Sequence, residues 1–453
     1  MDPIYGIITI GFVMVLGFIG NYIFNKTQIP SIVWLLLFGF VAGIIFNVQD
    51  FQNFNQKLFG DVSGLIGAIA IIIILFDGGI NTDLRQLFKG APRGLLLTVS
   101  SFCLSFIATL FIIVGLDAAG IINLNGHSFV IGSILGGIVA GTSSPIVIPL
   151  AYRLQNLQEK TKMVSSIESI LTDPICIVVV FAIAYMIFEL KEINLLLGFG
   201  NLVTTFSAGI VIGIAFGLVW LFIMNKIRKQ QFSYIMTLAI VFLVYSFTVM
   251  LVGSEQGGDG AGAIACLAFG LILGNGKKIL KMVDYQGKGF QMDDETKQFH
   301  ALTSFVIRTF FFVYLGMIVS FQNIEFILIG IIILIGLILV RYLAIKITTY
   351  KDSFEKDDEQ TMLVMMPRGL AAAILAINFG PRLAVSLTDA SGNPLLWLEP
   401  FFKDVAFVVI LGSSIITTVG VSLICHYENK KPKKEECITD VRNKIDTISE
   451  EEK

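Results

Sequence analysis

Long apolar stretches separated by short polar loops run through this sequence from near its first residue to about residue 426. Most of these stretches hold about 17 to 26 residues, the length at which an α-helix crosses a hydrocarbon core of roughly 30 Å. Only 15% of the 453 residues are charged, and the mean hydropathy is +0.81, whereas soluble domains carry about 25% charged residues. The pattern therefore predicts an all-α polytopic membrane protein.

The apolar stretches number about thirteen, and we expect each to form one transmembrane helix. They lie at about 4–24, 30–46, 62–77, 92–116, 128–151, 161–188, 200–225, 232–252, 259–274, 298–321, 324–349, 361–386 and 399–426. The first stretch lacks a basic region before it and a small-residue cleavage site after it, so it is expected to be a span and not a signal peptide.

The basic residues predict how the chain is oriented. Lys and Arg in the loops and adjoining helix ends number 18 after the first, third, fifth, seventh, ninth and eleventh segments, and 4 after the other six. Because loops rich in Lys and Arg stay in the cytoplasm, we expect the amino terminus outside and the carboxyl terminus inside. Residues 427–453 are polar and of mixed charge, so we expect a transmembrane domain of residues 1–426 followed by a disordered cytoplasmic tail.

Two of the segments carry helix breakers near their centres. The fifth, SFVIGSILGGIVAGTSSPIVIPLAY, contains Pro145, and the twelfth, QTMLVMMPRGLAAAILAINFG, contains Pro367, Arg368 and Gly369. Interrupted segments at matching places in two halves are typical of transporters built from inverted repeats. With the seventh segment as a linker, segments 1–6 would map onto 8–13, and the offset of seven reverses every helix. Two proline-kinked helices without a repeat are the alternative.

Asp173, about halfway along the sixth segment, is the main candidate for a functional group, because an acid in hydrocarbon is costly and usually functional. Ser169 shares its helix face, and Pro174 leaves the carbonyl of Ile170 without its usual donor. Such hard oxygen atoms suit a small cation such as Na⁺. Further hydroxyl groups are available on Thr172 of the same segment and on Thr142, Ser143 and Ser144 of the fifth segment.

The Asp173 carboxylate can also take up a proton, because removal from water favours its neutral form. A cation and a proton would then compete for one group. The protein could switch Asp173 between the two sides of the membrane only when a cation or a proton is bound to it. The competition would then itself be an exchange mechanism. The alternative is an Asp that stabilises an irregular helix through hydrogen bonds.

Glu168 and Arg341, on the sixth and eleventh segments, are expected to lie at the same depth, about 8 Å from the midplane at 1.5 Å of rise per residue. An ion pair between them would leave Asp173 as the one freely titrating acid and would favour one cation per proton. The alternative for Arg341 is that its side chain extends to the interface. For Arg368, beside the second break, two roles are open: it balances the carboxyl ends of half-helices, or it guides ions.

Two further charges receive open interpretations. Arg308 falls near the middle of the tenth segment, where a role in helix packing and a role in an access funnel both fit. Asp77 falls at a cytoplasmic helix end, where we expect a solvated carboxylate.

Several other classes of protein do not fit the sequence. The cysteines (Cys103, Cys176, Cys266, Cys425 and Cys437) lack metal-ligand spacing and are expected to be mostly buried free thiols. The histidines (His127, His300 and His426) do not cluster. An intramembrane protease needs a serine or a paired-aspartate motif that the chain lacks. A channel needs a ring of ligands around a pore, and an inverted repeat within a single subunit argues against such a ring. We therefore expect a transporter, not an enzyme, with no cofactor and no nucleic-acid partner.

Three motifs together resemble the monovalent cation:proton antiporter family, in its electroneutral sodium/proton exchanger branch of the NhaP type. ESILTDP at 168–174 is similar to the E-S-x-x-N-D signature of that branch, LFDGGINTDL at 75–84 to its F-E-G-G-L-x-x-D-L segment, and MPRGLAAAILA at 366–376 to its x-R-G-x-x-x-x-A-L-A segment. The resemblance extends over most of residues 1–426.

The resemblance implies roles for individual residues. Asp173 matches the ion-binding aspartate, and Ser169 a cation-ligating serine. Glu168 with Arg341 matches a structural ion pair. Ser143 matches the threonine of the T-D-P motif, and Arg368 the arginine at the second helix break. The family fold has an inverted repeat, a core bundle and a dimerisation bundle, and the resemblance implies a homodimer that transports sodium and protons across a prokaryotic cell membrane by an elevator-like movement.

Two positions depart from the motifs of the branch. Thr172 stands where the branch usually has Asn, so a hydroxyl must support Asp173 in place of an amide. Ser144 replaces the acid of the T-D-P motif, which changes the charge balance at the helix crossing. Both departures leave the choice between sodium and potassium open, and a potassium/proton antiporter of the same fold is the alternative function.

Overall fold

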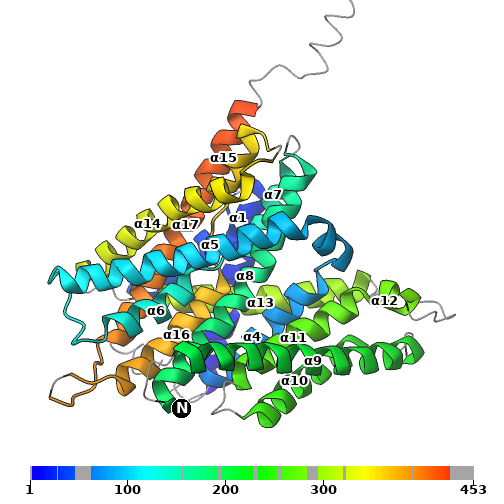
Figure 1. The fold of residues 1–453 in the computed structure, drawn as a ribbon, viewed down its shortest axis with the longest axis horizontal. Coiled ribbons are helices and arrows are strands. Elements are labelled where there is room, and N and C mark those ends of the chain that lie inside the picture. Colours follow the sequence, from blue (N-terminus) through cyan, green and yellow to red (C-terminus); the bar gives the residue numbers. More distant parts are fainter. Residues whose placement is uncertain are drawn as a thin grey trace, which may run out of the picture.

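The computed structural model of the protein is almost entirely helical (Figure 1). It describes residues 3–27, 29–45, 63–154, 157–190, 195–227, 233–253, 258–282, 294–319, 323–352, 354–389 and 391–428. The helices are α1 Pro3–Thr27, α2 Ser31–Ile45, α4 Ser63–Ile80, α5 Leu84–Ala118, α6 Ser128–Val139, α7 Ser144–Arg153, α8 Glu159–Tyr185 with a π-helical turn Met186–Leu190, α9 Leu195–Ile227, α10 Ser233–Val252, α11 Gly258–Gly274, α12 Gly276–Met282, α13 Asp294–Ile318, α14 Ile324–Thr349, α15 Lys356–Val364, α16 Leu370–Ser386 and α17 Leu398–Glu428.

The helices follow the apolar segments of the sequence, with differences at their ends. Within the described residues, eight spans are long and apolar enough to cross a membrane, and shorter apolar helices lie beside them. Helix α5 begins at Leu84, before the predicted start at residue 92. Helix α17 continues to Glu428, and the tail after it lies outside the described residues. Both differences arise because helical hydrogen bonding continues past the apolar stretch, whereas hydropathy marks only the part that fits the hydrocarbon core.

The fifth and twelfth segments are each divided into two helices. Helix α6 ends at Val139 and α7 begins at Ser144, so the first break covers residues 140–143. The sequence had centred this break on Pro145, which instead lies in the first turn of α7, where proline loses no hydrogen bond. The second break separates α15 from α16 and covers residues 365–369, as the position of Pro367 predicted.

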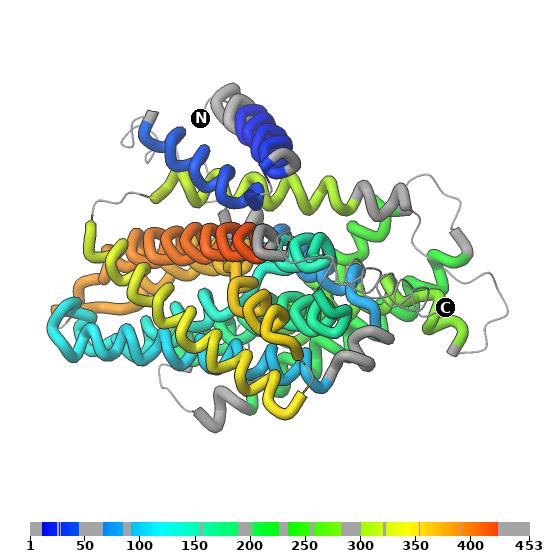
Figure 2. The backbone as a smooth tube through the Cα atoms, turned by 90° about the horizontal axis from the view of Figure 1, so that it is seen from above, coloured from blue at the N-terminus to red at the C-terminus, as the bar shows by residue number. Residues whose placement is uncertain are grey.

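The helices form one group around the breaks and further groups beside it. Helices α5, α8, α14 and α17 pack on one another and on the broken helices α6, α7, α15 and α16. Helices α1, α2 and α13 pack together, and so do α4, α9, α10 and α11. Figure 2 shows α1, α2 and α13 along one flank, with α17 beside them. The broken helices therefore lie within the packed interior, where irregular backbone in a membrane protein must be placed.

Glycine residues allow two helix pairs to approach very closely. In the pair α4 and α11, a Cβ atom on Gly270 would lie 2.6 Å from the carbonyl oxygen of Phe76. In the pair α2 and α13, a Cβ atom on Gly43 would lie 2.7 Å from the carbonyl oxygen of Met317. Small residues allow this backbone contact between helices in lipid. If segments 2 and 3 correspond to segments 9 and 10, the two pairs are equivalent, as the proposed inverted repeat requires.

We predict that Gly270→Ala destabilises the protein, because the added methyl group would meet the backbone of α4 and force α4 and α11 apart. Overpacking of this kind costs about 1–3 kcal/mol. The matched control is Gly115→Ala in α5, where a Cβ atom has nothing within 4 Å. Thermal unfolding of the two purified variants in detergent checks the prediction, and equal melting temperatures would contradict it.

Candidate functional site

The two helix breaks cross each other and are joined by their backbones. The N–H group of Ser143 in the first break donates to the carbonyl oxygen of Pro367 in the second, at 2.8 Å. Gly369 lies so close that a Cβ atom there would be 2.6 Å from Oγ of Ser143. Pro367 and Gly369 thus lie between the end of α15 and the start of α16. They allow the two broken segments to touch there. The contact satisfies backbone groups that the breaks would otherwise leave without partners.

Arg368 closes the carboxyl end of α6 at this crossing. Its guanidinium group donates to the carbonyl oxygens of Ala140 at 2.6 Å and of Gly141 at 2.8 Å. The backbone N–H group of Arg368 donates to Oγ of Ser413 on α17 at 2.9 Å. Arg368 is 1% exposed, so its charge is compensated inside the protein. The partial negative charge at the end of a helix is the natural partner for such a cation.

Asp173 lies on α8 against the first break. Its residue is 7% exposed, and its Oδ1 atom would be 3.4 Å from a Cβ atom placed on Gly141. The neighbouring Thr172 accepts a hydrogen bond from the N–H group of Thr142 at 3.0 Å, and the hydroxyl oxygens of these two threonines lie 3.2 Å apart. The structure therefore brings an acid, two hydroxyl groups and the open backbone of a helix break to one place.

The other residues predicted for this site have different surroundings. Ser169 is buried, and its hydroxyl donates to the carbonyl oxygen of Ser166 at 3.1 Å. Ser143 is also buried and joins the two breaks. Ser144 and Pro145 form the start of α7 and line a neighbouring cavity. A role of Ser169 or Ser143 as a cation ligand stays a prediction.

Glu168 and Arg341 form a buried ion pair. Arg341 contacts both carboxylate oxygens of Glu168, with 2.9 Å between Nη2 and Oε2. Arg341 also donates to the carbonyl oxygens of Met362 and Met365 at 2.9 and 3.0 Å, and to Oγ of Ser101 at 3.1 Å. It is 2% exposed, so the alternative that it extends to the interface is wrong. One guanidinium group thus holds α5, α8, α14 and the end of α15 together.

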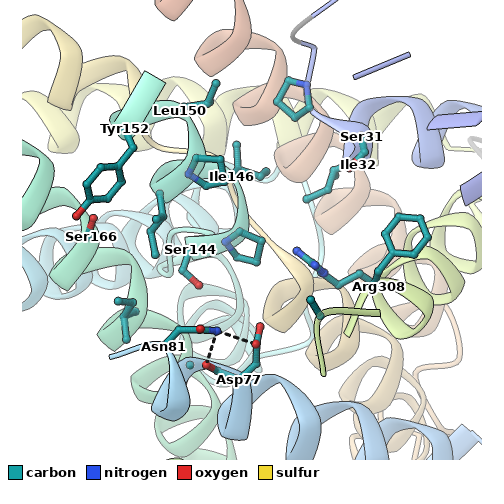
Figure 3. A pocket seen from close by; sticks show the side chains of 18 of the residues that line it. Ser31, Ile32, Asp77, Asn81, Ser144, Ile146, Leu150, Tyr152, Ser166 and Arg308 are labelled. Carbon is teal, nitrogen blue, oxygen red and sulfur yellow. Dashed lines mark hydrogen bonds between the residues drawn. The ribbon is translucent and has the colours of Figure 1, made fainter. Parts of the chain in front are cut away.

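A cavity of about 600 Å³ opens beside the crossing, lined by residues of α1, α2, α4, α7, α8 and α13. Figure 3 shows Ser144 and Arg308 on opposite sides of it, with Asp77 and Asn81 below. Ile170 of α8 belongs to the lining, and Asp173 follows it by one helical turn. Along α8 the cavity therefore comes within about one helical turn of the acid.

Sequence reasoning missed the surroundings of Asp77, which was expected to be solvated. Its carboxylate lies 2.9 Å from Nε2 of His300 and accepts a hydrogen bond from Asn81 at 2.8 Å. The other ring nitrogen of His300 lies 2.9 Å from the hydroxyl of Tyr234. These residues come from α4, α10 and α13, so only a three-dimensional arrangement could reveal the cluster.

The cysteines and the remaining histidines add no metal cluster in the described part of the chain, where no three His, Cys, Asp or Glu side chains come together. Cys176 and Cys266 are buried, but Cys103 is exposed, which corrects the expectation for that residue. Nε2 of His127 lies 2.9 Å from the carbonyl oxygen of Thr388. The side chains of Cys425 and His426 and all of Cys437 lie outside the described residues.

The sequence also matches a known protein family over nearly its whole length. The profile described as "Sodium/hydrogen exchanger, transmembrane" matches residues 11–426. The chain belongs to this sodium/hydrogen exchanger family. The resemblance read from the three motifs is thereby confirmed, and the matched residues include the crossing, the ion pair and the cavity lining.

The individual relatives that match this chain are distant in sequence. The potassium/proton antiporter NhaP of Alkalimonas amylolytica is 24% identical over 280 residues, which cover 60% of this chain and 44% of that protein. The chain thus matches less than half the length of this relative. A probable sodium/proton antiporter of Methanocaldococcus jannaschii is 26% identical over 356 residues, which cover 78% and 79% of the two chains.

A solved structure shares the fold of this chain. The sodium proton antiporter MjNhaP1 of Methanocaldococcus jannaschii, at pH 8, superposes with a TM-score of 0.72 at 22% identity, covering 94% of this chain and 98% of that one. The predicted fold class, an all-α polytopic membrane protein, is therefore confirmed.

We predict that Arg341→Ala destabilises the protein by about 3–5 kcal/mol, because it leaves the Glu168 carboxylate buried without its cation. The control is Lys346→Ala on the same helix, which removes an exposed ion pair with Glu359 and should change little. Thermal unfolding in detergent measures both variants. Equal unfolding temperatures for the two would show that the buried pair contributes no more than the exposed one.

Proposed function

We propose that the protein exchanges a monovalent cation, sodium or potassium, for a proton across the membrane, and that both compete for Asp173. The observation that carries this proposal is the position of Asp173, buried against the open backbone of Gly141 at the helix crossing. Carboxylate, hydroxyl and carbonyl oxygens at such a point can replace part of the water around a small cation. The same burial favours proton uptake when the cation leaves.

The charges around Asp173 favour a stoichiometry of one cation per proton. Arg341 neutralises Glu168, and Arg368 binds carbonyl oxygens at the end of α6. Asp173 is then the acid at the crossing that is free to exchange its bound ion. Exchange of one Na⁺ for one H⁺ moves no net charge, so we propose electroneutral transport.

The distribution of basic residues supports a proposal for the side of the membrane on which the cavity lies. The cavity is lined by the ends of α1 and α4, the beginnings of α2 and α8, most of α7 and the middle of α13. It lies on the side whose loops and adjoining helix ends carry 18 Lys and Arg. We propose that this side is cytoplasmic in a prokaryotic cell membrane, with the amino terminus outside and the carboxyl terminus inside. From the resemblance alone we further propose a homodimer whose core bundle moves as an elevator.

We predict that Asp173→Asn abolishes exchange without unfolding the protein, because the amide keeps the shape but can neither lose a proton nor balance a cation. The test is dissipation of a pH gradient in proteoliposomes on addition of sodium, lithium or potassium. Glu325→Gln, an exposed acid in the first turn of α14, is the matched control and should exchange normally. Wild-type rates in Asp173→Asn would overturn the site assignment, and the preferred cation of the wild type decides between sodium and potassium.

We predict that Thr172→Val raises the half-saturating cation concentration about tenfold. Valine keeps the volume but leaves the Thr142 N–H group without its acceptor, and an unsatisfied buried donor costs about 1–3 kcal/mol. The control is Thr109→Val in α5, whose hydroxyl donates within its own helix. If both variants have the same half-saturating concentration, Thr172 does not organise the break for cation binding.

A further inference from the structure

Arg308 places a cationic group in the cavity that leads toward Asp173. It lies on α13 and belongs to the cavity lining. Its Nε atom donates to the carbonyl oxygen of Ser304, one turn earlier on the same helix, at 3.3 Å. Figure 3 shows the end of the guanidinium group directed into the cavity, across from Ser144. Ile170, one turn before Asp173, belongs to the same lining, so an ion in this cavity comes under the influence of the Arg308 charge.

The acids in the cavity lining, Asp77 and Asp83, have other partners, and Asp77 also interacts electrostatically with Arg308. Asp77 lies 2.9 Å from Nε2 of His300 and accepts a hydrogen bond from Asn81 at 2.8 Å. Asp83 forms an ion pair with Lys278. Across the cavity, Ser144 presents a neutral hydroxyl. Asp77 thus offsets part of the charge of Arg308, whereas Ser144 adds no negative charge on the opposite side of the cavity.

We propose that Arg308 is a specificity-determining residue that repels cations in the cavity and sets the concentration at which they reach Asp173. This inference rests on the proposed function. Coulomb repulsion is proportional to the charge of the entering ion. A repulsion that lowers the local concentration of a monovalent cation about 3- to 10-fold therefore lowers that of a divalent cation by the square, about 10- to 100-fold. Arg308 would thus protect an oxygen-lined site from Mg²⁺ and Ca²⁺.

The alternative is that Arg308 only supports the packing of α13. A packing role predicts equal effects on cations of every charge, and a lower maximal rate or lower stability. An electrostatic role predicts that the KM for the cation changes only when the cation is added on the cavity side. Removal of the positive charge at position 308 should then lower this KM, and retention of the charge should preserve it. The two roles are separable because lysine preserves the charge but not the shape of the guanidinium group.

The experiment compares Arg308→Gln and Arg308→Lys in proteoliposomes of known orientation, with the transported cation added to the cavity side. We expect Arg308→Gln to lower KM about 3- to 10-fold, with the maximal rate less affected. We also expect inhibition by Mg²⁺ at about 10- to 100-fold lower concentration. Arg308→Lys should keep the wild-type KM. Arg382→Gln is the control, because it removes the same charge from the exposed end of α16 beside Phe379.

A second variant covers the case in which Arg308→Gln does not fold. Ser144→Asp adds a compensating charge across the cavity and should lower KM in the same direction. An unchanged KM in both Arg308→Gln and Ser144→Asp, or equal changes in Arg308→Gln and Arg308→Lys, would overturn the inference. If the wild type exchanges cations but the variants give one of these results, only the inference about Arg308 is contradicted. If the wild type exchanges no cation, the proposed function is contradicted as well.

Discussion

The open backbone at the two helix breaks is the constraint on which the rest of the structure depends. In a hydrocarbon environment each unsatisfied N–H or C=O group costs several kcal/mol. The protein meets that cost by crossing the breaks, so that Ser143 donates to Pro367, and by aiming Arg368 at the carbonyl oxygens of Ala140 and Gly141. The burial of the surrounding helices follows from the need to keep this crossing away from lipid.

Two buried arginines near the crossing bind different partners. Arg341 binds an acid and the end of α15 and so joins four elements. Arg368 binds a helix end and leaves the neighbouring acid to other partners. Because an arginine presents several N–H groups in a fixed plane, it can satisfy carbonyl and carboxylate oxygens together. This division explains how an ionisable group such as Asp173 can lie in the same interior without being locked into a salt bridge.

Much of this architecture could be predicted from the sequence, because it depends on position along a helix axis. Apolar length gave the spans, Pro367 and Gly369 gave the second break, and rise per residue placed Glu168 and Arg341 at one depth. The first break was misplaced because Pro145 begins a helix as readily as it ends one. The cluster of Asp77, His300 and Tyr234 could not be predicted, because depth does not say which faces of distant helices meet. The exposure of Cys103 was missed for the same reason.

The glycine contacts have a consequence for how such a molecule can rearrange. Where Gly270 meets the carbonyl oxygen of Phe76, and Gly43 that of Met317, two backbones touch with no side chain between them. Such close contacts leave little room for one helix to shift against the other, so we expect each pair to move as one rigid unit. An opening that lets an ion pass is then expected along the boundaries between these pairs and their neighbours, which side chains fill.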